Sequence, residues 1–328
     1  MGTMAEIDSN NIDSTNIEST NIDSTNAADD IVAPEADSDR RVPAPRARWS
    51  WLLVVGPGLI WGCSFLFIDE GLRATSPAGV TFARIAIGLA VMAVIPAARR
   101  PIRRDDRGRV ALLGVLWIAF PMMMFPFAEQ HVSSALTGML NAATPLFTAI
   151  VAASLVRRFP SRTVVAALAV GVLGTVLVAA PSLGHGSSQA TAIALILAAL
   201  VSYGFAINLA RPLQQRNGAL PVILRALAVA FVLTAPFGGW GALHGNWTIG
   251  PALCLVALGG LGTGIANVMV ATAAGRGGAT HASAMAFIMP TVSLLLGVVI
   301  RHEHVAAVSI VGGGVCVAGA YLLSRAKH

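Results

Sequence analysis

Five polar residues with helical spacing offer the clearest chemistry in this chain. Ser134, Thr137, Asn141, Thr144 and Thr148 recur at intervals of three and four residues, which places them on one face of a helix. Their hydroxyl and amide groups could bind a polar solute, and the Asn141 amide is the most costly of them to bury without a partner. The alternative is that they bond neighbouring helices or the carbonyls of their own helix.

Aromatic and methionine side chains offer apolar contacts to such a solute. Trp61, Ser64 and Phe65 share one helical face, and Tyr203 takes the place of Trp61 in a later segment. These rings could stack on a solute or close its path. A deformable apolar face, of the kind that suits promiscuous binding, is formed by Phe120, Met123, Met124 and Phe127. Ordinary helix packing is the alternative for both groups.

Ionisable side chains are rare inside the apolar segments, so each is a candidate ligand. Arg84 could meet a substrate carboxylate or snorkel outward. It could instead pair with an acid near the end of a segment, namely Asp69, Glu70 or Glu129. His281 opens a later segment and could titrate or bind solute, with a capping or interfacial role as the alternative.

Amide, glycine and proline positions complete the set of candidates. Asn267 is a candidate ligand on a helical face that it shares with Gly260, Thr263 and Gly264. The glycines of that face favour a close approach of helices. Pro145 and Pro290 interrupt two segments, where a kink could act as a hinge or only shape static packing.

Ten apolar runs must position these residues. Roughly 20 helical residues cross a bilayer core, and runs without strict alternation favour helices over a closed barrel. The runs are residues 50–68, 77–97, 110–128, 132–156, 163–180, 189–210, 219–239, 250–274, 279–300 and 306–324. The sequence therefore predicts an all-α integral membrane protein with ten transmembrane helices.

The composition excludes an ordinary soluble enzyme. Only 12% of the residues are charged and 55% are hydrophobic, whereas a soluble domain carries roughly 25% charged residues. The basic residues form short clusters rather than a continuous stripe, which argues against nucleic-acid binding. Cys63, Cys254 and Cys316 lie singly in apolar segments, so we expect reduced core thiols, with no disulfide, no metal site and no cofactor.

Residues 1–48 form a separate region. Three pentapeptides, NIDST, NIEST and NIDST, follow one another, and ten of the sixteen acidic residues precede Arg40. Because no aromatic residue occurs before Trp49, we expect a disordered, acidic cytoplasmic tail. It does not resemble a cleavable signal peptide, since the first apolar run begins near Ser50 and no small-residue cleavage motif follows it.

The placement of basic residues predicts the orientation. With the N-terminus inside, 19 bases lie on the cytoplasmic side and two, Arg73 and Arg301, lie outside. Cytoplasmic retention of positive loops favours this arrangement. The expected location is a plasma membrane of the bacterial inner-membrane type, with both termini cytoplasmic.

The two halves of the apolar region repeat one another. Pro145 precedes Gly174 by 29 residues, and Pro290 precedes Gly319 by 29 residues. The dipeptides Trp61-Gly62 and Tyr203-Gly204 occupy matching places in the first and sixth runs.

An odd number of helices in each copy makes the second copy enter the membrane from the opposite face. This predicts two inverted five-helix repeats, over residues 49–182 and 188–325. Such repeats are typical of secondary transporters, with a solute site where the halves meet.

These segments resemble the drug/metabolite transporter superfamily, EamA type, whose hallmark is two five-helix repeats. The resemblance lies in GLIWGCSFLFI, SPAGVTFARIAIG, SALTGMLNAATPLFTAIVA and AMAFIMPTVSLLLGVVIRHEHV, and in the Gly-rich last segment. Members usually carry a glutamate after the fourth and ninth helices; Glu303 fills the second place, and Arg158 stands in the first. The resemblance implies export or exchange of small metabolites, such as amino acids, or of toxic compounds.

The leading hypothesis is a secondary transporter of a small-molecule solute, not an enzyme, that works in the lipid bilayer as a monomer or homodimer. An importer or a lipid-carrier flippase of the same fold is the runner-up, and a non-transporting receptor is a further class. Every acid outside the tail falls at a segment end or in a loop, so we expect no obligatory proton step.

Reporter fusions test the predicted topology. Fusions after Arg109 and Arg162 should report the cytoplasm, because these loops carry the clustered arginines. Fusions near His185 and His244 should report the outside. A cytoplasmic signal at His185 would contradict the assignment.

Overall fold

The computed structural model describes residues 47–156, 159–184, 186–274 and 279–326. The side chains of residues 47–51, 54 and 273–287 lie outside this description. So does the predicted acidic tail, apart from residues 47 and 48. Within the described ranges the chain forms helices and no strand.

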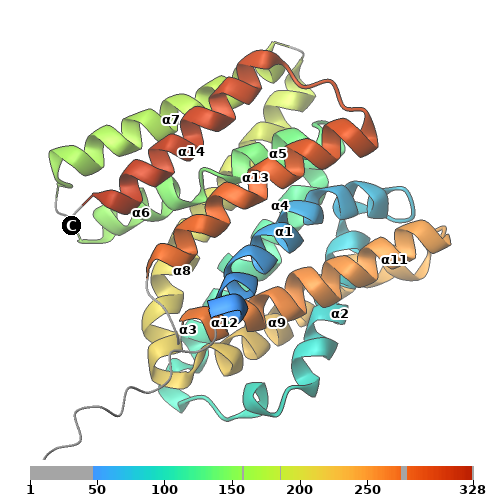
Figure 1. Cartoon of the computed structure of the whole chain (residues 1–328). Helices are drawn as coiled ribbons and strands as arrows, with labels where there is room; N and C mark the ends of the chain where they lie inside the picture. The colour runs from blue at the N-terminus through green and yellow to red at the C-terminus, as the bar shows by residue number, and fades with distance from the viewer. Residues whose placement is uncertain (1–46, 157–158, 185, 275–278, 327–328) are drawn as a thin grey trace, which may run out of the picture. The chain divides into compact units, whose positions relative to one another are not determined.

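The helices follow one another with short connections (Figure 1). In chain order the α-helices are α1 (Ala47–Leu72), α2 (Pro77–Val94), α3 (Arg107–Leu113), α4 (Phe120–Glu129), α5 (Ser134–Asn141), α6 (Thr144–Val156), α7 (Arg162–Leu183), α8 (Ser187–Asn217), α9 (Ala219–Thr234), α10 (Trp240–Leu243), α11 (Ile249–Ala257), α12 (Ala266–Ala274), α13 (Ala279–Arg301) and α14 (Ala307–Arg325). Two 3-10 turns, η1 (Pro96–Arg99) and η2 (Arg104–Asp106), and three π-helical stretches, η3 (Gly114–Ala119), η4 (Ala235–Gly239) and η5 (Leu258–Ile265), lie between them.

Eight segments of the described residues are long and apolar enough to cross a membrane. They are Pro77–Val94, Arg104–Glu129, Ser134–Val156, Arg162–Leu183, Ser187–Asn217, Ala219–Leu243, Ile249–Thr272 and Ala307–Arg325. Each coincides with a predicted run, and the other two runs fall on α1 and α13, where Ile288–Arg301 forms a shorter apolar helix. The helical membrane class is confirmed, and the total of ten spans stays a prediction.

Two helix starts are encoded by a local serine cap. Ser76 precedes α2 and accepts a hydrogen bond from the Gly79 N–H at 3.2 Å, with proline in the first turn. Ser133 precedes α5 and accepts one from the Leu136 N–H at 3.2 Å. Each serine satisfies a backbone donor that has no partner within its helix.

The fourth apolar run forms one membrane-length segment, Ser134–Val156, and its helix is interrupted next to Pro145, as the sequence predicts. Helix α5 ends at Asn141 and α6 begins at Thr144. Pro145 has no N–H, so it cannot bond to the Asn141 carbonyl four residues earlier. The Thr144 hydroxyl donates to that carbonyl at 2.7 Å instead, which satisfies the buried acceptor.

The π-helical stretches also coincide with glycine and proline. Pro236 lies inside η4, Pro121 follows η3, and η5 reads LGGLGTGI. The wider turn of η5 changes the helical phase, so the predicted shared face of the eighth run is wrong for Gly260. A Cβ at Gly260 would meet nothing within 4 Å, whereas one at Gly259 would meet the Ile87 side chain and the Arg84 carbonyl.

Helices α7 and α14 lie side by side and approach through glycine (Figure 1). A Cβ on Gly174 would lie 2.6 Å from Cys316 Cα, and one on Gly319 would lie 2.5 Å from Gly171 Cα. The sequence alignment pairs Gly174 with Gly319 and, in the same register, Gly171 with Cys316. The two contacts are therefore reciprocal, as a two-fold relation between the halves requires.

Other helix pairs show the same reciprocity. A Cβ on Gly62 in α1 would meet Val292 in α13, and one on Gly204 in α8 would meet the Phe147 carbonyl in α6. These four positions are also equivalent in the two halves. Small residues therefore set the distances between the helices of both halves in the same way.

Replacing Gly319 by leucine should destabilise the protein, because the side chain would have to enter the backbone of α7. We expect a loss of about 1–3 kcal/mol of stability, typical of overpacking. Thermal unfolding of the purified protein in detergent measures it. Gly314 lies on the same helix with nothing within 4 Å of its Cβ position, so Gly314→Leu is the matched control. Equal stability of the two variants would contradict the packing argument.

Candidate functional site

The indole of Trp61 connects the first half of the chain to the second. Its Nε1–H donates to the Gly262 carbonyl in η5 at 2.9 Å. In the π-helical register the Ala266 N–H bonds to the Leu261 carbonyl rather than to that of Gly262. Trp61 thus satisfies a carbonyl that the irregular helix presents to its neighbour. Next to it, the buried Ser64 hydroxyl donates to the Ile60 carbonyl of its own helix at 3.1 Å.

Arg84 is buried inside the bundle and is 7% exposed. Its Nε–H donates to the Thr263 hydroxyl oxygen at 2.9 Å, and the Asn267 amide donates to the Thr263 carbonyl at 2.8 Å. Arg84 therefore does not snorkel to the surface. Among the described residues it forms no ion pair. Two of its expected partners, Asp69 and Glu70, pair with other arginines instead.

Glu129 lies at the end of α4, where the sequence places it, but it is buried. Its side chain is 6% exposed, and neither carboxylate oxygen has a hydrogen-bond partner among the described residues. It interacts electrostatically with Glu303 and Arg84. Helical phase was the available signal, because Glu129 follows the buried Met122 by seven residues and Phe125 by four.

Three aromatic rings form a cluster that reaches Arg84 through Tyr203. Phe65 and Phe125 meet edge to face with their centroids 5.8 Å apart, and Phe125 lies 6.0 Å from Tyr203. Arg84 also interacts electrostatically with Tyr203. The structure therefore brings Trp61, Tyr203 and Arg84 into one region, together with Phe65 and Phe125, where α1, α2, α4, α8 and η5 meet.

The polar stripe of the fourth run forms mostly local hydrogen bonds. Thr137 donates to the Ser133 carbonyl at 3.0 Å, and Thr148 donates to the Thr144 carbonyl at 2.8 Å. Ser134 bonds to Glu303, and the Asn141 amide reaches across to the Met289 sulfur at 3.4 Å. Because a thioether sulfur is a weak acceptor, Asn141 keeps hydrogen-bonding capacity for another ligand.

The remaining candidates show no contact to the charged pair among the described hydrogen bonds and ion pairs. Phe127 is 39% exposed, Met123 is half-buried, and Pro290 lies within α13. The His281 side chain lies outside the described residues.

Charged residues tie three elements together at the end of the bundle that is predicted to face outward. Glu303 accepts hydrogen bonds from the Ser134 hydroxyl at 2.7 Å, the Ser134 N–H at 3.0 Å and the Ala135 N–H at 2.9 Å. It therefore caps α5, where a negative charge is favourable. Arg301 forms ion pairs with Asp69 and, at 3.3 Å, with Glu70, both near the end of α1.

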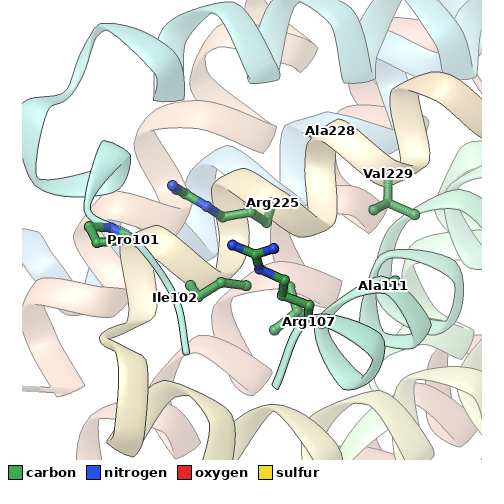
Figure 2. Close-up of a pocket in the computed structure, with 8 residues that line it drawn as sticks. Pro101, Ile102, Arg107, Ala111, Arg225, Ala228 and Val229 are labelled. Atoms are coloured by element: carbon green, nitrogen blue, oxygen red, sulfur yellow. The ribbon is translucent and has the colours of Figure 1, made fainter. Parts of the chain in front are cut away.

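A separate cavity of about 410 Å³ lies between α3 and α9 (Figure 2). It is lined by Pro101, Ile102, Arg107, Val110, Ala111, Arg225, Ala228 and Val229. The Arg225 guanidinium already donates to the carbonyls of Ala98 at 2.6 Å and Arg99 at 3.0 Å. This cavity contains none of the predicted site residues.

Cys63, Cys254 and Cys316 are free cysteines. No group of three or more His, Cys, Asp or Glu side chains that could hold a metal ion occurs among the described residues.

Known proteins resemble this chain over most of its length. The sequence profile of the EamA-like transporter family matches residues 48–180 and again residues 190–325. A probable terminal-alkyne amino-acid exporter from Streptantibioticus cattleyicolor is 27% identical over 287 residues, which cover 85% of this chain and 94% of that protein. An uncharacterized transporter from Archaeoglobus fulgidus is 22% identical over 84% of this chain and 99% of its own length. A solved crystal structure with 22% identity covers 85% of this chain and 98% of its own, with a TM-score of 0.60, which shows a shared fold.

Removing the Glu303 carboxylate should destabilise the protein, because Ser134 and Ala135 would lose their acceptor. For Glu303→Ala we expect a loss of about 1–3 kcal/mol, with Glu303→Gln in between. Thermal unfolding in detergent measures it, with the exposed Asp105→Ala as the matched control. A Glu303→Ala variant as stable as the wild type would contradict the capping role.

Proposed function

Because the chain belongs to the EamA-like transporter family, we propose that it exports or exchanges small organic solutes by alternating access. The chain is a multi-pass membrane protein whose relatives are named as transporters. One relative is named as an amino-acid exporter, which favours amino acids or similar metabolites as cargo. An importer or a flippase of the same fold is the alternative.

The proposed solute path lies between two inverted five-helix repeats, over residues 49–182 and 188–325. The observation that carries this proposal is the set of contacts that cross between the halves. Trp61 bonds to Gly262, Arg84 to Thr263, and Asn141 to Met289. The reciprocal glycine contacts support the inverted relation. In transporters built from such repeats, the site lies at the repeat interface.

Alternating access requires one end of the path to be closed while the other is open. The ion pairs of Arg301 with Asp69 and Glu70 hold α1 and α13 together at the end predicted to be outside. At the symmetry-related place, between α6 and α8, Val156 stands in the position of Arg301 and Arg211 in that of Asp69; both are exposed. The same ion pair cannot form there. We therefore assign the Arg301 pairs to the outer gate, with Pro145 and Pro290 as hinges.

We infer the energy source of transport from the contacts of the acidic side chains. Glu303, the family's acidic position, is committed to the N-terminus of α5, so we do not assign it a proton-carrying role. We propose a uniporter or exchanger driven by solute gradients, acting as a monomer or homodimer without a cofactor. The test is counterflow in liposomes, which should proceed without a pH gradient. Strict dependence on that gradient would contradict this mechanism.

Asn141→Leu should abolish transport while leaving membrane expression intact. The substitution removes an amide whose nitrogen faces the second half with only a weak acceptor there, while its oxygen accepts from the Thr144 hydroxyl at 3.1 Å. A comparison of secreted and retained metabolite pools, in cells with and without the gene, identifies a transported solute, whose counterflow is then measured. Asn246→Leu, in an exposed loop, is the matched control. Full activity of Asn141→Leu would remove this residue from the path.

A further inference from the structure

Two ionisable side chains of opposite formal charge are buried near each other without forming an ion pair. Arg84 and Glu129 are 7% and 6% exposed and interact electrostatically. Both belong to the described residues, and no nitrogen of Arg84 lies within 4 Å of an oxygen of Glu129. Burial of an unpaired charge is costly, so this arrangement favours a ligand that completes both partners.

The Arg84 guanidinium is held in one orientation. Its Nε–H is committed to Thr263, which is itself 1% exposed. Its two terminal nitrogens form no hydrogen bond to another described residue. A guanidinium held by Nε can present these two nitrogens as a planar fork, which matches the two oxygens of a carboxylate.

The Glu129 carboxylate supplies the complementary half. Both oxygens are acceptors without partners, and an ammonium group has three donors to offer them. Its acidic neighbour Glu303 is already satisfied by Ser134 and Ala135. Glu129 is therefore the carboxylate of this region that is free to bind a cation.

We propose that Arg84 and Glu129 together bind the two charges of a zwitterion, an α-amino acid or a close derivative. Arg84 binds the carboxylate and Glu129 binds the ammonium group, while Phe65, Phe125 and Tyr203 contact the apolar side chain. This inference rests on the proposed transport function and names its substrate class.

The same geometry predicts how related molecules are rejected. A deaminated acid would leave Glu129 buried without a partner. A decarboxylated amine would leave Arg84 buried without one. A site discriminates strongly against an analogue whose binding would leave one of the site's buried polar groups unpaired. Selectivity for the zwitterion over both fragments is therefore the signature of the site.

Binding to the purified full-length chain in nanodiscs tests the proposal. The probes are three matched sets: leucine with 3-methylbutylamine and 4-methylpentanoate, alanine with ethylamine and propanoate, and phenylalanine with 2-phenylethylamine and 3-phenylpropanoate. In at least one set the amino acid should bind about tenfold or more tightly than both fragments. If no amino acid binds more tightly than its own acid and amine, the proposal is overturned.

Two variants assign the charges to their residues. Glu129→Gln keeps the shape of the side chain and should remove the preference for the amino acid over its acid. Arg84→Lys keeps the positive charge without the fork and should reduce the preference over the amine. Asp105→Asn and Arg109→Lys, at exposed positions, are the matched controls. Unchanged selectivity in Glu129→Gln overturns the assignment, and because selectivity is a ratio within one sample, partial misfolding does not imitate the effect.

Liposome counterflow separates this inference from the proposed function. Zwitterion-selective binding without any counterflow would contradict transport and leave the assignment of Arg84 and Glu129 intact. Counterflow of solutes with no preference for a zwitterion would support transport and overturn the inference.

Discussion

Every backbone carbonyl inside a bilayer needs a donor from within the protein, and the irregular parts of this fold depend on that constraint. Pro145 and the glycine-rich η5 stretch both interrupt regular helical bonding. At each place a side chain supplies the missing donor: the Thr144 hydroxyl bonds to Asn141, and the Trp61 indole bonds to Gly262. The interruptions are therefore stable, and they lie where the two halves of the chain face each other.

Close packing of small residues brings those interruptions together. Lipid tails are as apolar as leucine, so burial alone gives little reason for one helix to prefer another. Glycine lets backbones approach, and the contacts of Gly174 and Gly319 are reciprocal between the halves. Glycine contacts of the same kind, Gly62 with Val292 and Gly259 with Ile87, position α1 against α13 and α2 against η5, which brings Trp61 and Arg84 to their partners.

The charged residues divide into two groups with different consequences. Arg301 and Glu303 find partners near the helix ends, so they connect α13 and the residues after it to α1 and α5. Arg84 and Glu129 are buried without pairing, so their charges remain available. In the mechanism that we propose, the paired charges hold one conformation, and the unpaired ones receive their partner with the solute.

The sequence by itself determined the helical membrane class and the transporter family, because hydrophobic length and the order of segments are properties of the chain before it folds. It also identified the Pro145 interruption, which separates α5 from α6. Only the tertiary structure decided which polar groups are free. Thr137 and Thr148 share the spacing of Asn141 but bond to their own helix, and Glu129 ends a helix yet is buried by its neighbours. Spacing along a helix predicts the face of a residue, whereas its partners depend on the other helices that pack against that face.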